Sequence, residues 1–243
     1  MKTLVCSDIH ANLKALDAVL LAAGEVDRVW CLGDIIGYGP DPNGVIERLA
    51  GLSNLTCLAG NHDLAALSVI SLENFNNESR IAIEWQRSIL SPESVSFLTP
   101  LKSKSDQFTN ISLAHGSPLD PIWGYVHSEN AADMILHTVM AELVMVGHTH
   151  MQSFFRQPRA KDRVDYRMTT AGEVIDLDGR FILNPGSVGQ PRDHDPRAAF
   201  AIYDDGDATF TMRRAAYDIK AVADQIFEFG LPAKNAERLF VGN

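Results

Sequence analysis

Five short patches of this sequence place potential metal ligands beside tight turns, and each patch follows an apolar run typical of a buried strand. In chain order they are Asp8-Ile9-His10, Gly33-Asp34, Gly60-Asn61-His62-Asp63, His115-Gly116 and Gly147-His148-Thr149-His150. If the runs are neighbouring strands, two Asp, one Asn and four His side chains meet at adjacent strand ends. Such a set suits two divalent metal ions, and paired metals are typical of phosphate-ester chemistry.

Strands and helices alternate in the first part of the sequence. The predicted strands are 3–7, 28–32 and 54–58, and the predicted helices between them are 11–23 and 42–49. This alternation favours a parallel sheet core with right-handed crossovers. Residues 64–98 are predicted to be mostly helical, with a break at residues 75–77 and a helix start at Ser91-Pro92-Glu93. Residues 110–114 and 143–146 are predicted strands, and residues 128–140 a helix.

Short strand-like runs dominate the sequence after His150. They are residues 151–156, 164–169, 173–177, 180–183, 198–204 and 207–213, and helices are predicted at 216–229 and 232–240. Asp178-Gly179 and Asp205-Gly206 predict hairpins between them. The whole pattern predicts one α/β domain over residues 1–243, a four-layer αββα sandwich of two mixed sheets packed face to face with helices outside. Residues 64–108 are expected to form a helical insertion near the site.

The charge and residue usage restrict the partners and the compartment. A formal net charge of −10 argues against nucleic-acid binding, because a nonspecific binder needs a basic surface. An anionic substrate remains compatible, since bound dications reverse the local field. No run approaches the ~20 apolar residues of a membrane span, and no signal-peptide pattern is present. Cys6, Cys31 and Cys57 suggest no disulfide framework and fit a reducing cytoplasm. The sequence leaves the oligomeric state open.

The ligand types indicate which metals fit. Carboxylate and imidazole ligands suit divalent Mn, Fe, Zn, Co or Ni. Asp8 and His10 are two residues apart and point the same way if the backbone stays extended. Asp34 is the candidate bridge between two ions, and His148 and His150 would offer one ring to each. The neutral Asn61 oxygen suits the second ion.

Taken in order, these patches resemble the calcineurin-like metallophosphoesterase superfamily. Its pattern is D-x-H, G-D, G-N-H-[DE], H and G-H-x-H, and the match covers residues 5–189. Asn184-Pro185-Gly186-Ser187 is also similar to a turn of the bacterial and archaeal phosphodiesterase-like branch. The resemblance implies the metallo-dependent phosphatase fold, which is an αββα sandwich with a dinuclear metal centre.

The resemblance also implies roles for individual residues. The first metal would be held by Asp8, His10, Asp34 and His150, and the second by Asp34, Asn61, His115 and His148. His62, with Asn61, would face the substrate, and His62 would steady a phosphate oxygen or protonate the leaving group. The implied activity is hydrolysis of a phosphodiester or phosphoanhydride of a small, nucleotide-derived substrate by a metal-bound hydroxide.

One motif departs from the protein serine/threonine phosphatases and the symmetrical dinucleoside tetraphosphatases. Those classes carry G-D-x-x-D-R-G, whereas this chain has Gly33-Asp34-Ile35-Ile36-Gly37-Tyr38-Gly39. The second Asp, which usually orients the histidine at the position of His62, and the phosphate-gripping Arg are missing. We therefore expect Asp63 to orient His62 and Arg192 to clamp phosphate. A protein phosphatase and a non-enzymatic scaffold remain the alternative functions.

Two loops beside the motifs are expected to select the substrate. They are residues 37–42, next to Asp34, and residues 117–127, next to His115. Tyr38, Trp123 and Tyr125 in these loops either stack on a base or pack the loops against the fold. The sequence does not distinguish these two roles.

Overall fold

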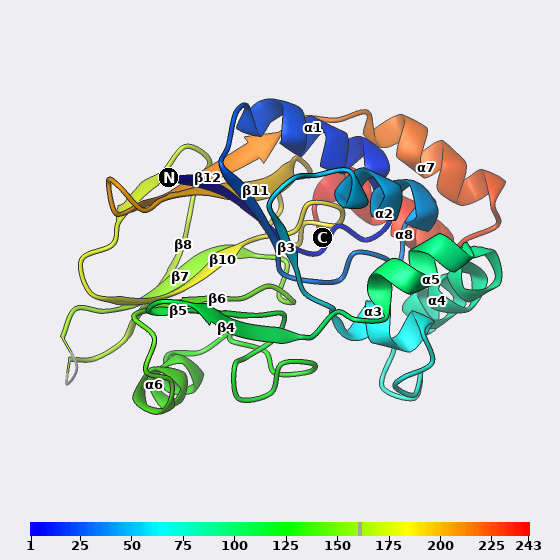
Figure 1. Cartoon of the computed structure of the whole chain (residues 1–243). Coiled ribbons are helices and arrows are strands. Elements are labelled where there is room, and N and C mark those ends of the chain that lie inside the picture. Colours follow the sequence, from blue (N-terminus) through cyan, green and yellow to red (C-terminus); the bar gives the residue numbers. More distant parts are fainter. Residues whose placement is uncertain (160–161) are drawn as a thin grey trace.

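Two six-stranded mixed β-sheets form the centre of the protein (Figure 1). They are described by a computed structural model covering residues 1–159 and 162–243. The first sheet contains β1 (Lys2–Cys6), β2 (Arg28–Cys31), β3 (Leu55–Cys57), β9 (Val174–Asp176), β11 (Ala198–Asp204) and β12 (Thr209–Ala215), in the order β3-β2-β1-β11-β12-β9. The second contains β4 (Lys104–Phe108), β5 (Ile111–Ala114), β6 (Leu143–Met145), β7 (Gln152–Gln157), β8 (Asp165–Met168) and β10 (Arg180–Pro185), in the order β4-β5-β6-β10-β7-β8.

Alternating side chains give each sheet two buried faces. In β1, Val5 belongs to the core between the sheets, whereas Leu4 and Cys6 belong to a core on the outer face. In β10, Phe181 packs between the sheets and Ile182 packs outward. Because successive strand residues point to opposite faces, continuous apolar runs are what a sheet covered on both sides requires.

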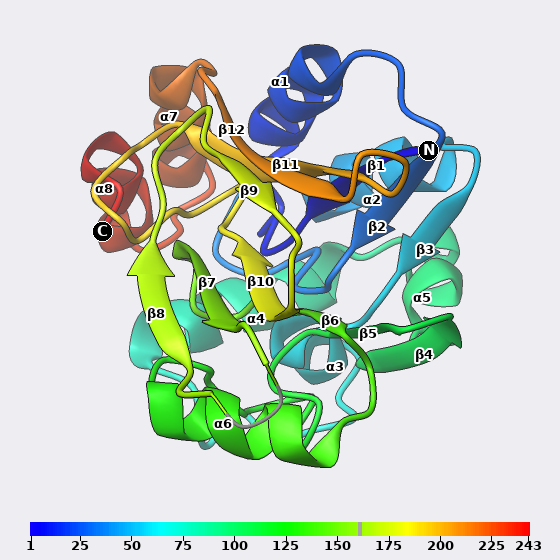
Figure 2. The same ribbon diagram turned by 90° about the vertical axis from the view of Figure 1, so that its left-hand side faces the viewer.

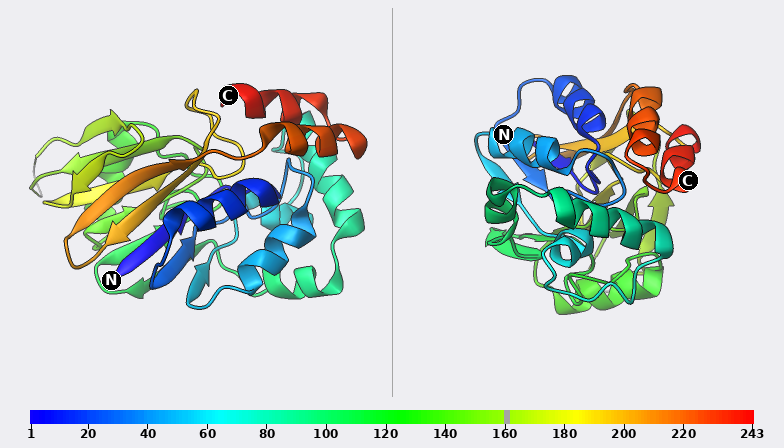
Figure 3. Two further views of the ribbon diagram at one scale, coloured as in Figure 1. Left: turned by 90° about the horizontal axis from the view of Figure 1, so that it is seen from above. Right: turned by 90° about the vertical axis from the view of Figure 1, so that its right-hand side faces the viewer.

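Helices cover the outer faces of both sheets, as the sequence predicts. The helices α1 (Leu13–Ala23) and α2 (Pro42–Ala50) contribute to the outer core of the first sheet. The helix α6 (Glu129–Thr138) packs on the second sheet (Figure 2). The C-terminal helices α7 (Ile219–Glu228) and α8 (Ala233–Val241) share a small core with α4 (Asn77–Ile89). Figure 3 shows these helices at one end of the molecule. In the described part of the chain, no helix has the length and apolarity to cross a bilayer.

Most predicted elements are confirmed to within a few residues, and one predicted turn is wrong. Strands β1, β2 and β3 are parallel, and the turn containing Asp205-Gly206 joins the antiparallel pair β11 and β12. Asp178-Gly179 does not form a hairpin, because β9 pairs with β12 in one sheet and β10 pairs with β7 in the other. Gly179 lies in a bend, and the tertiary partners of the flanking strands decide which sheet each strand joins.

The segment 64–108 contains both helices and a strand. It includes the end of α3 (Asn61–Ala66), then α4 and α5 (Pro92–Leu98), followed by β4. The helix start at Ser91-Pro92 is confirmed, since the Ser91 side chain accepts a hydrogen bond from the Ser94 backbone. Strand β4 was not predicted, because this edge strand is partly exposed and largely polar and so carries little apolar signal.

The core between the sheets is expected to supply much of the stability. Phe181 is 0% exposed and packs 5.9 Å from Phe154 between ring centroids. Phe181→Ala should lower the free energy of unfolding by about 3–5 kcal/mol, because it leaves a cavity in a packed interior. Urea denaturation with Leu21→Ala as the exposed control, expected to change stability by less than about 0.5 kcal/mol, measures this. Equal losses in the two variants would contradict this view of the core.

Candidate metal centre

The five ligand patches meet at one end of the two sheets. Each patch follows the carboxyl end of a strand, in the order β1, β2, β3, β5 and β6. The first three strands are parallel in one sheet, and β5 and β6 are parallel in the other. Because parallel strands bring their carboxyl ends to the same edge, patches far apart in sequence converge.

One group of potential ligands consists of Asp8, His10, Asp34 and His150, all buried. The His10 Nε2 and His150 Nε2 atoms lie 3.1 Å apart. His150 Nε2 is 3.3 Å from Asp8 Oδ1, and His10 Nε2 is 3.8 Å from Asp34 Oδ2. Four ligand atoms within 4.8 Å of one another form a compact cage that one cation can fill.

A second group consists of Asp34, His115 and His148, and it shares Asp34 with the first. His115 Nε2 lies 3.2 Å from His148 Nδ1 and 3.5 Å from Asp34 Oδ2. The Asn61 side-chain oxygen lies 3.2 Å from the same His115 nitrogen. The structure therefore brings together all seven residues predicted as ligands, in two groups joined by one carboxylate.

The tautomers of three histidines are fixed by backbone carbonyls. Each has its Nδ1 atom against a carbonyl oxygen, His10 against Ile36 at 3.1 Å, His115 against Leu32 at 3.0 Å and His150 against Gln190 at 2.6 Å. A carbonyl only accepts, so each Nδ1 carries the hydrogen and each Nε2 presents a lone pair. The lone pairs of His10 and His150 face each other and repel unless a cation lies between them. This arrangement fits a metal site, and the carbonyls are its orienting partners.

Burial controls the charges in this cluster. Burial lowers the pKa of His148 to about 2, with a smaller contribution from His115. Burial also lowers the pKa of His10, so these imidazoles are neutral, the form that binds metals. For Asp34, burial and then the Asp8 carboxylate raise the pKa well above its usual range. A bound dication would offset the cost of burying these carboxylates.

Left-handed backbone turns orient the ligand side chains. Asp8 and His10 have φ of 54° and 49°, and Asp34 has φ of 50°. His148 and His150 have φ of 67° and 61°. Non-glycine residues rarely adopt this conformation, and such strain gathers at functional sites. The backbone of Asp8-Ile9-His10 therefore does not stay extended, and the left-handed turns bring both side chains to one site.

Two side chains of the Asn184–Ser187 turn brace the ligand loops. Asn184 Nδ2 donates to the Gly147 carbonyl at 2.9 Å, just before His148. Ser187 Oγ donates to the Asp8 carbonyl at 2.8 Å. These hydrogen bonds tie the loop after β6, which belongs to the second sheet, to the loop after β1, which belongs to the first. The turn thus fixes the position of Asp8 relative to His150, two ligands of the first group that come from different sheets.

A small pocket opens onto the ligands. It has a volume of about 70 Å³, and Asp34, Asn61, His62, His148 and His150 line it. The other lining residues include Tyr38, Asn74, Phe75, Asn76, Ser79, Trp123, Tyr125 and Arg192. Phe75 and its asparagine neighbours were missed from the sequence, because they lie in an irregular break before α4 that matches no motif. A volume this small suits one phosphoryl group better than a whole nucleotide.

His62 faces this pocket but is not oriented by Asp63. The Asp63 carboxylate accepts hydrogen bonds from the backbone N–H groups of Ile35, Ile36 and Gly60. Within residues 1–159 and 162–243, the buried His62 Nδ1 has no hydrogen-bond partner. Burial raises the pKa of Asp63 to about 7 despite these three donors. The predicted orienting contact is therefore wrong, and Asp63 instead fixes the loop that carries Asp34.

Arg192 and Tyr38 lie together at the rim of the ligand cluster. The Arg192 guanidinium carbon is 5.7 Å from the Tyr38 ring centroid, and Arg192 Nη2 lies 3.3 Å from the Tyr38 hydroxyl. The same nitrogen donates to Gln190 Oε1 at 2.9 Å. Since Arg192 lines the pocket, its position suits a cation that faces a phosphate oxygen.

The two aromatic residues of the 117–127 loop pack over the site. The ring of Tyr125 stacks on the His148 ring at 4.0 Å between centroids and 24° between planes. Trp123 packs edge-on against Phe75 at 5.1 Å. Tyr125 is nonetheless 48% exposed, so it covers a candidate ligand while keeping much of its surface open to solvent.

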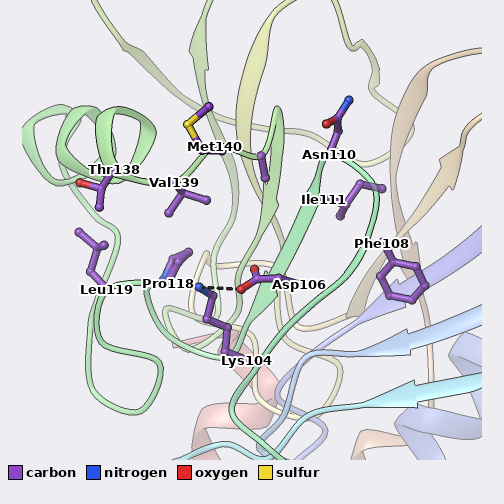
Figure 4. Close-up of a pocket in the computed structure, with 11 residues that line it drawn as sticks. Lys104, Asp106, Phe108, Asn110, Ile111, Pro118, Leu119, Thr138, Val139 and Met140 are labelled. Carbon is purple, nitrogen blue, oxygen red and sulfur yellow. Dashed lines mark ion pairs between the residues drawn. The ribbon is translucent and has the colours of Figure 1, made fainter.

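A larger hollow of about 430 Å³ lies elsewhere, between β4, β5 and the end of α6 (Figure 4). Phe108, Ile111, Leu119 and Met140 contribute apolar surface to it, and Lys104 pairs with Asp106 at 2.9 Å. None of the residues predicted for the site line it. The hollow therefore has no part in the chemistry of the ligand cluster.

Comparison with known proteins agrees with this geometry. The calcineurin-like phosphoesterase superfamily domain matches residues 1–207. A metallophosphoesterase structure from Sphaerobacter thermophilus is 39% identical, with a TM-score of 0.91 over 100% of this chain and 99% of that one.

Two sequence relatives extend the comparison. An uncharacterised protein of Methanocaldococcus jannaschii is 35% identical over 98% of this chain and 97% of its own length. A symmetrical bis(5'-nucleosyl)-tetraphosphatase of Pectobacterium atrosepticum is 36% identical over only 28% of this chain and 26% of its own length. From the match over residues 1–207 and the shared fold, the chain belongs to the calcineurin-like phosphoesterase superfamily.

Proposed function

We propose that this protein is a phosphodiesterase-like hydrolase that uses two divalent cations to cleave a nucleotide-derived phosphodiester or phosphoanhydride. The observation that carries the proposal is the pair of ligand groups joined by Asp34 at the pocket. Two metal ions that share a carboxylate are suited to hold both the attacking and the leaving oxygen of a phosphoryl centre. Mn, Fe, Zn, Co and Ni all suit this imidazole and carboxylate set.

The ligand residues divide between the two cations. Asp8, His10, Asp34 and His150 would hold one, and Asp34, Asn61, His115 and His148 the other. When bound, the cations would supply Lewis acidity, polarising phosphoryl oxygens and lowering the pKa of bound water. The backbone carbonyls behind three of the histidines keep the ligand nitrogens pointing inward and so preorganise the site.

Two further residues would act on the substrate directly. Arg192 would hold a non-bridging phosphate oxygen, because a guanidinium matches the planar geometry of phosphate. His62 would donate its N–H to the leaving oxygen and pass the proton as the bond breaks, a step typically worth about 10²–10⁴-fold in rate. Burial lowers the pKa of His62, and the negative charge of a bound phosphate would favour its imidazolium form, which can release a proton and return to neutral imidazole.

The aromatic side chains of Trp123 and Tyr125 at the pocket opening support a nucleotide-derived substrate. A pocket of about 70 Å³ takes a phosphoryl group, which leaves the rest of the substrate at the opening beside Trp123 and Tyr125. Stacking on such rings is favourable for any base. The local likeness to a symmetrical bis(5'-nucleosyl)-tetraphosphatase supports the same class. The Gly33–Gly39 motif of this chain lacks the Asp and Arg that the symmetrical tetraphosphatases carry. We therefore expect a substrate different from that of those enzymes.

A metal-reconstituted screen tests the proposal. The chelated protein would receive Mn, Co, Ni, Zn or Mg and be offered aryl phosphomonoesters, aryl phosphodiesters, cyclic nucleotides, dinucleoside polyphosphates and a phosphopeptide. We expect diesters or dinucleoside polyphosphates to be turned over fastest, with no activity in the chelated control. Preferred hydrolysis of the phosphopeptide would instead indicate a protein phosphatase. Metal binding without any turnover would indicate a scaffold.

A further inference from the structure

The loop of residues 37–39 fixes the space available to the His62 ring. Gly37 has φ of 101°, and a Cβ atom placed there would overlap the His62 ring at Nδ1. The Tyr38 ring lies 4.7 Å from the His62 ring between centroids, and the Phe75 ring lies 5.1 Å from it. Since the buried Nδ1 has no partner in the described chain, packing rather than a hydrogen bond sets the ring's orientation.

A single buried side chain, Gln86 of α4, holds this loop from both sides. Gly37 donates its backbone N–H to Gln86 Oε1 at 2.7 Å, and Gln86 Nε2 donates to the Gly39 carbonyl at 2.8 Å. Gln86 is 0% exposed, so both bonds are shielded from water. Tyr38 between them has φ of 52°, a conformation that needs such support in a residue with a side chain.

A second amide from a distant helix supports the same turn. Asn235 of α8 is buried and donates to the Tyr38 carbonyl at 3.3 Å. Helix α8 lies beyond residue 207, where the family match ends. The loop is thus held by side chains from two helices that lie far apart in sequence, and neither side chain belongs to a motif.

We propose that Gln86 is a positioning residue for His62, acting through Gly37 and Tyr38, and this inference rests on the proposed function. The pattern G-D-x-x-D-R-G of the protein serine/threonine phosphatases and symmetrical dinucleoside tetraphosphatases has an Asp where this chain has Gly37 and an Arg where it has Tyr38. In this chain, the orienting carboxylate is replaced by a glycine that lets the backbone contact the ring. Gln86 keeps that backbone in place, so it governs the proton-donating step.

A kinetic experiment on leaving groups tests the inference. Gln86→Leu removes both hydrogen bonds with little change in volume. Gln157→Leu is the matched control, because Gln157, at the far end of β7, is 1% exposed and its side chain bonds only to the Asp162 carbonyl within residues 1–159 and 162–243. The substrates are two aryl phosphodiesters, one releasing 4-nitrophenol and the other phenol. Metal content and melting temperature are measured for every variant.

The expected result is selective. For Gln86→Leu, kcat for the phenol-releasing diester falls by about tenfold or more, because a poor leaving group needs the proton. The 4-nitrophenol-releasing diester changes by less than about threefold, and KM and metal content stay at the parent values. Equal loss on both substrates, or a profile matching Gln157→Leu, overturns the inference.

A conservative variant provides a rescue test. Buried glutamate is held in its neutral form, which can accept from Gly37 and donate to Gly39. We therefore expect Gln86→Glu to recover most of the lost kcat on the phenol-releasing diester. Activity as low as that of Gln86→Leu would count against the two-sided support of the loop.

A measurement independent of turnover separates this inference from the proposed function. In zinc-loaded protein with ¹³C-labelled histidine, the His62 ring signal is identified by its loss in His62→Gln. Gln86→Leu should shift or broaden that signal, whereas Gln157→Leu should leave it unchanged. An unchanged signal in Gln86→Leu refutes the positioning role. A parent protein that hydrolyses no phosphoester refutes the proposed function, even where the signal moves.

Discussion

Asp34→Asn is expected to lose bound metal and hydrolytic activity together. Asp34 Oδ2 lies 3.8 Å from His10 Nε2 and 3.5 Å from His115 Nε2, so one carboxylate serves both ligand groups. The amide has the same shape but lacks the negative charge that joins two cations. The loss of metal affinity should exceed the roughly 10–100-fold that removal of an outer partner typically causes.

The fold should survive this substitution. Asp34 Oδ1 accepts the His62 backbone N–H at 2.9 Å, and the Asn side-chain oxygen can accept the same bond. Metal content by elemental analysis and hydrolysis of a bis-aryl phosphate measure the effect, with the exposed Asp207→Asn as the control. If Asp34→Asn hydrolysed the diester at the parent rate, the bridging assignment would be wrong.

Unlike Asp34→Asn, His62→Ala is expected to keep its bound metal and to lose only turnover. His62 lines the pocket, but its side chain belongs to neither ligand group. If it supplies a proton to the leaving oxygen, its removal should lower kcat by about 10²–10⁴-fold for substrates with poor leaving groups. The effect should be much smaller for 4-nitrophenol esters, which leave without protonation.

The measurement compares kcat across a series of leaving groups for metal-loaded parent and variant. His137→Ala is the control, because His137 is an exposed residue at the end of α6 whose side chain is 60% accessible. A steeper dependence of kcat on the leaving-group pKa in His62→Ala supports the role. Loss of metal from His62→Ala, or an equal loss of rate on every ester, would show that the ring acts structurally.

The sequence predicted most of the fold because the strands are local apolar runs with clear ends. The two sheets, the parallel order of β1, β2 and β3 and the helix start at Ser91-Pro92 all follow from such signals. Strand β4 was not predicted, because its pairing with β5 rather than its composition makes it a strand. The hairpin predicted at Asp178-Gly179 was wrong, because a turn signal does not determine whether the next strand joins the same sheet or the opposite one.

The candidate site divides in a similar way. The ligand residues could be chosen from residue type, spacing and position after apolar runs. The left-handed backbone at Asp8 and His148 could not, because most Asp and His residues adopt other conformations and residue type alone does not select this one. The Asp63 assignment failed for a related reason. A carboxylate next to His62 in sequence was expected beside its ring, but helix α3 turns it toward the backbone N–H groups of Ile35, Ile36 and Gly60.

By itself the sequence determined which side chains can bind metal and that they follow strands, because ligand chemistry and strand periodicity are local properties. Only the tertiary structure decided that Asp34 lies between two groups of ligands and that paired histidine nitrogens face each other 3.1 Å apart. It alone placed Gln86 and Asn235 around the Tyr38 turn. These contacts join residues far apart in the chain, so they depend on how the two sheets and the outer helices pack rather than on any short stretch of sequence.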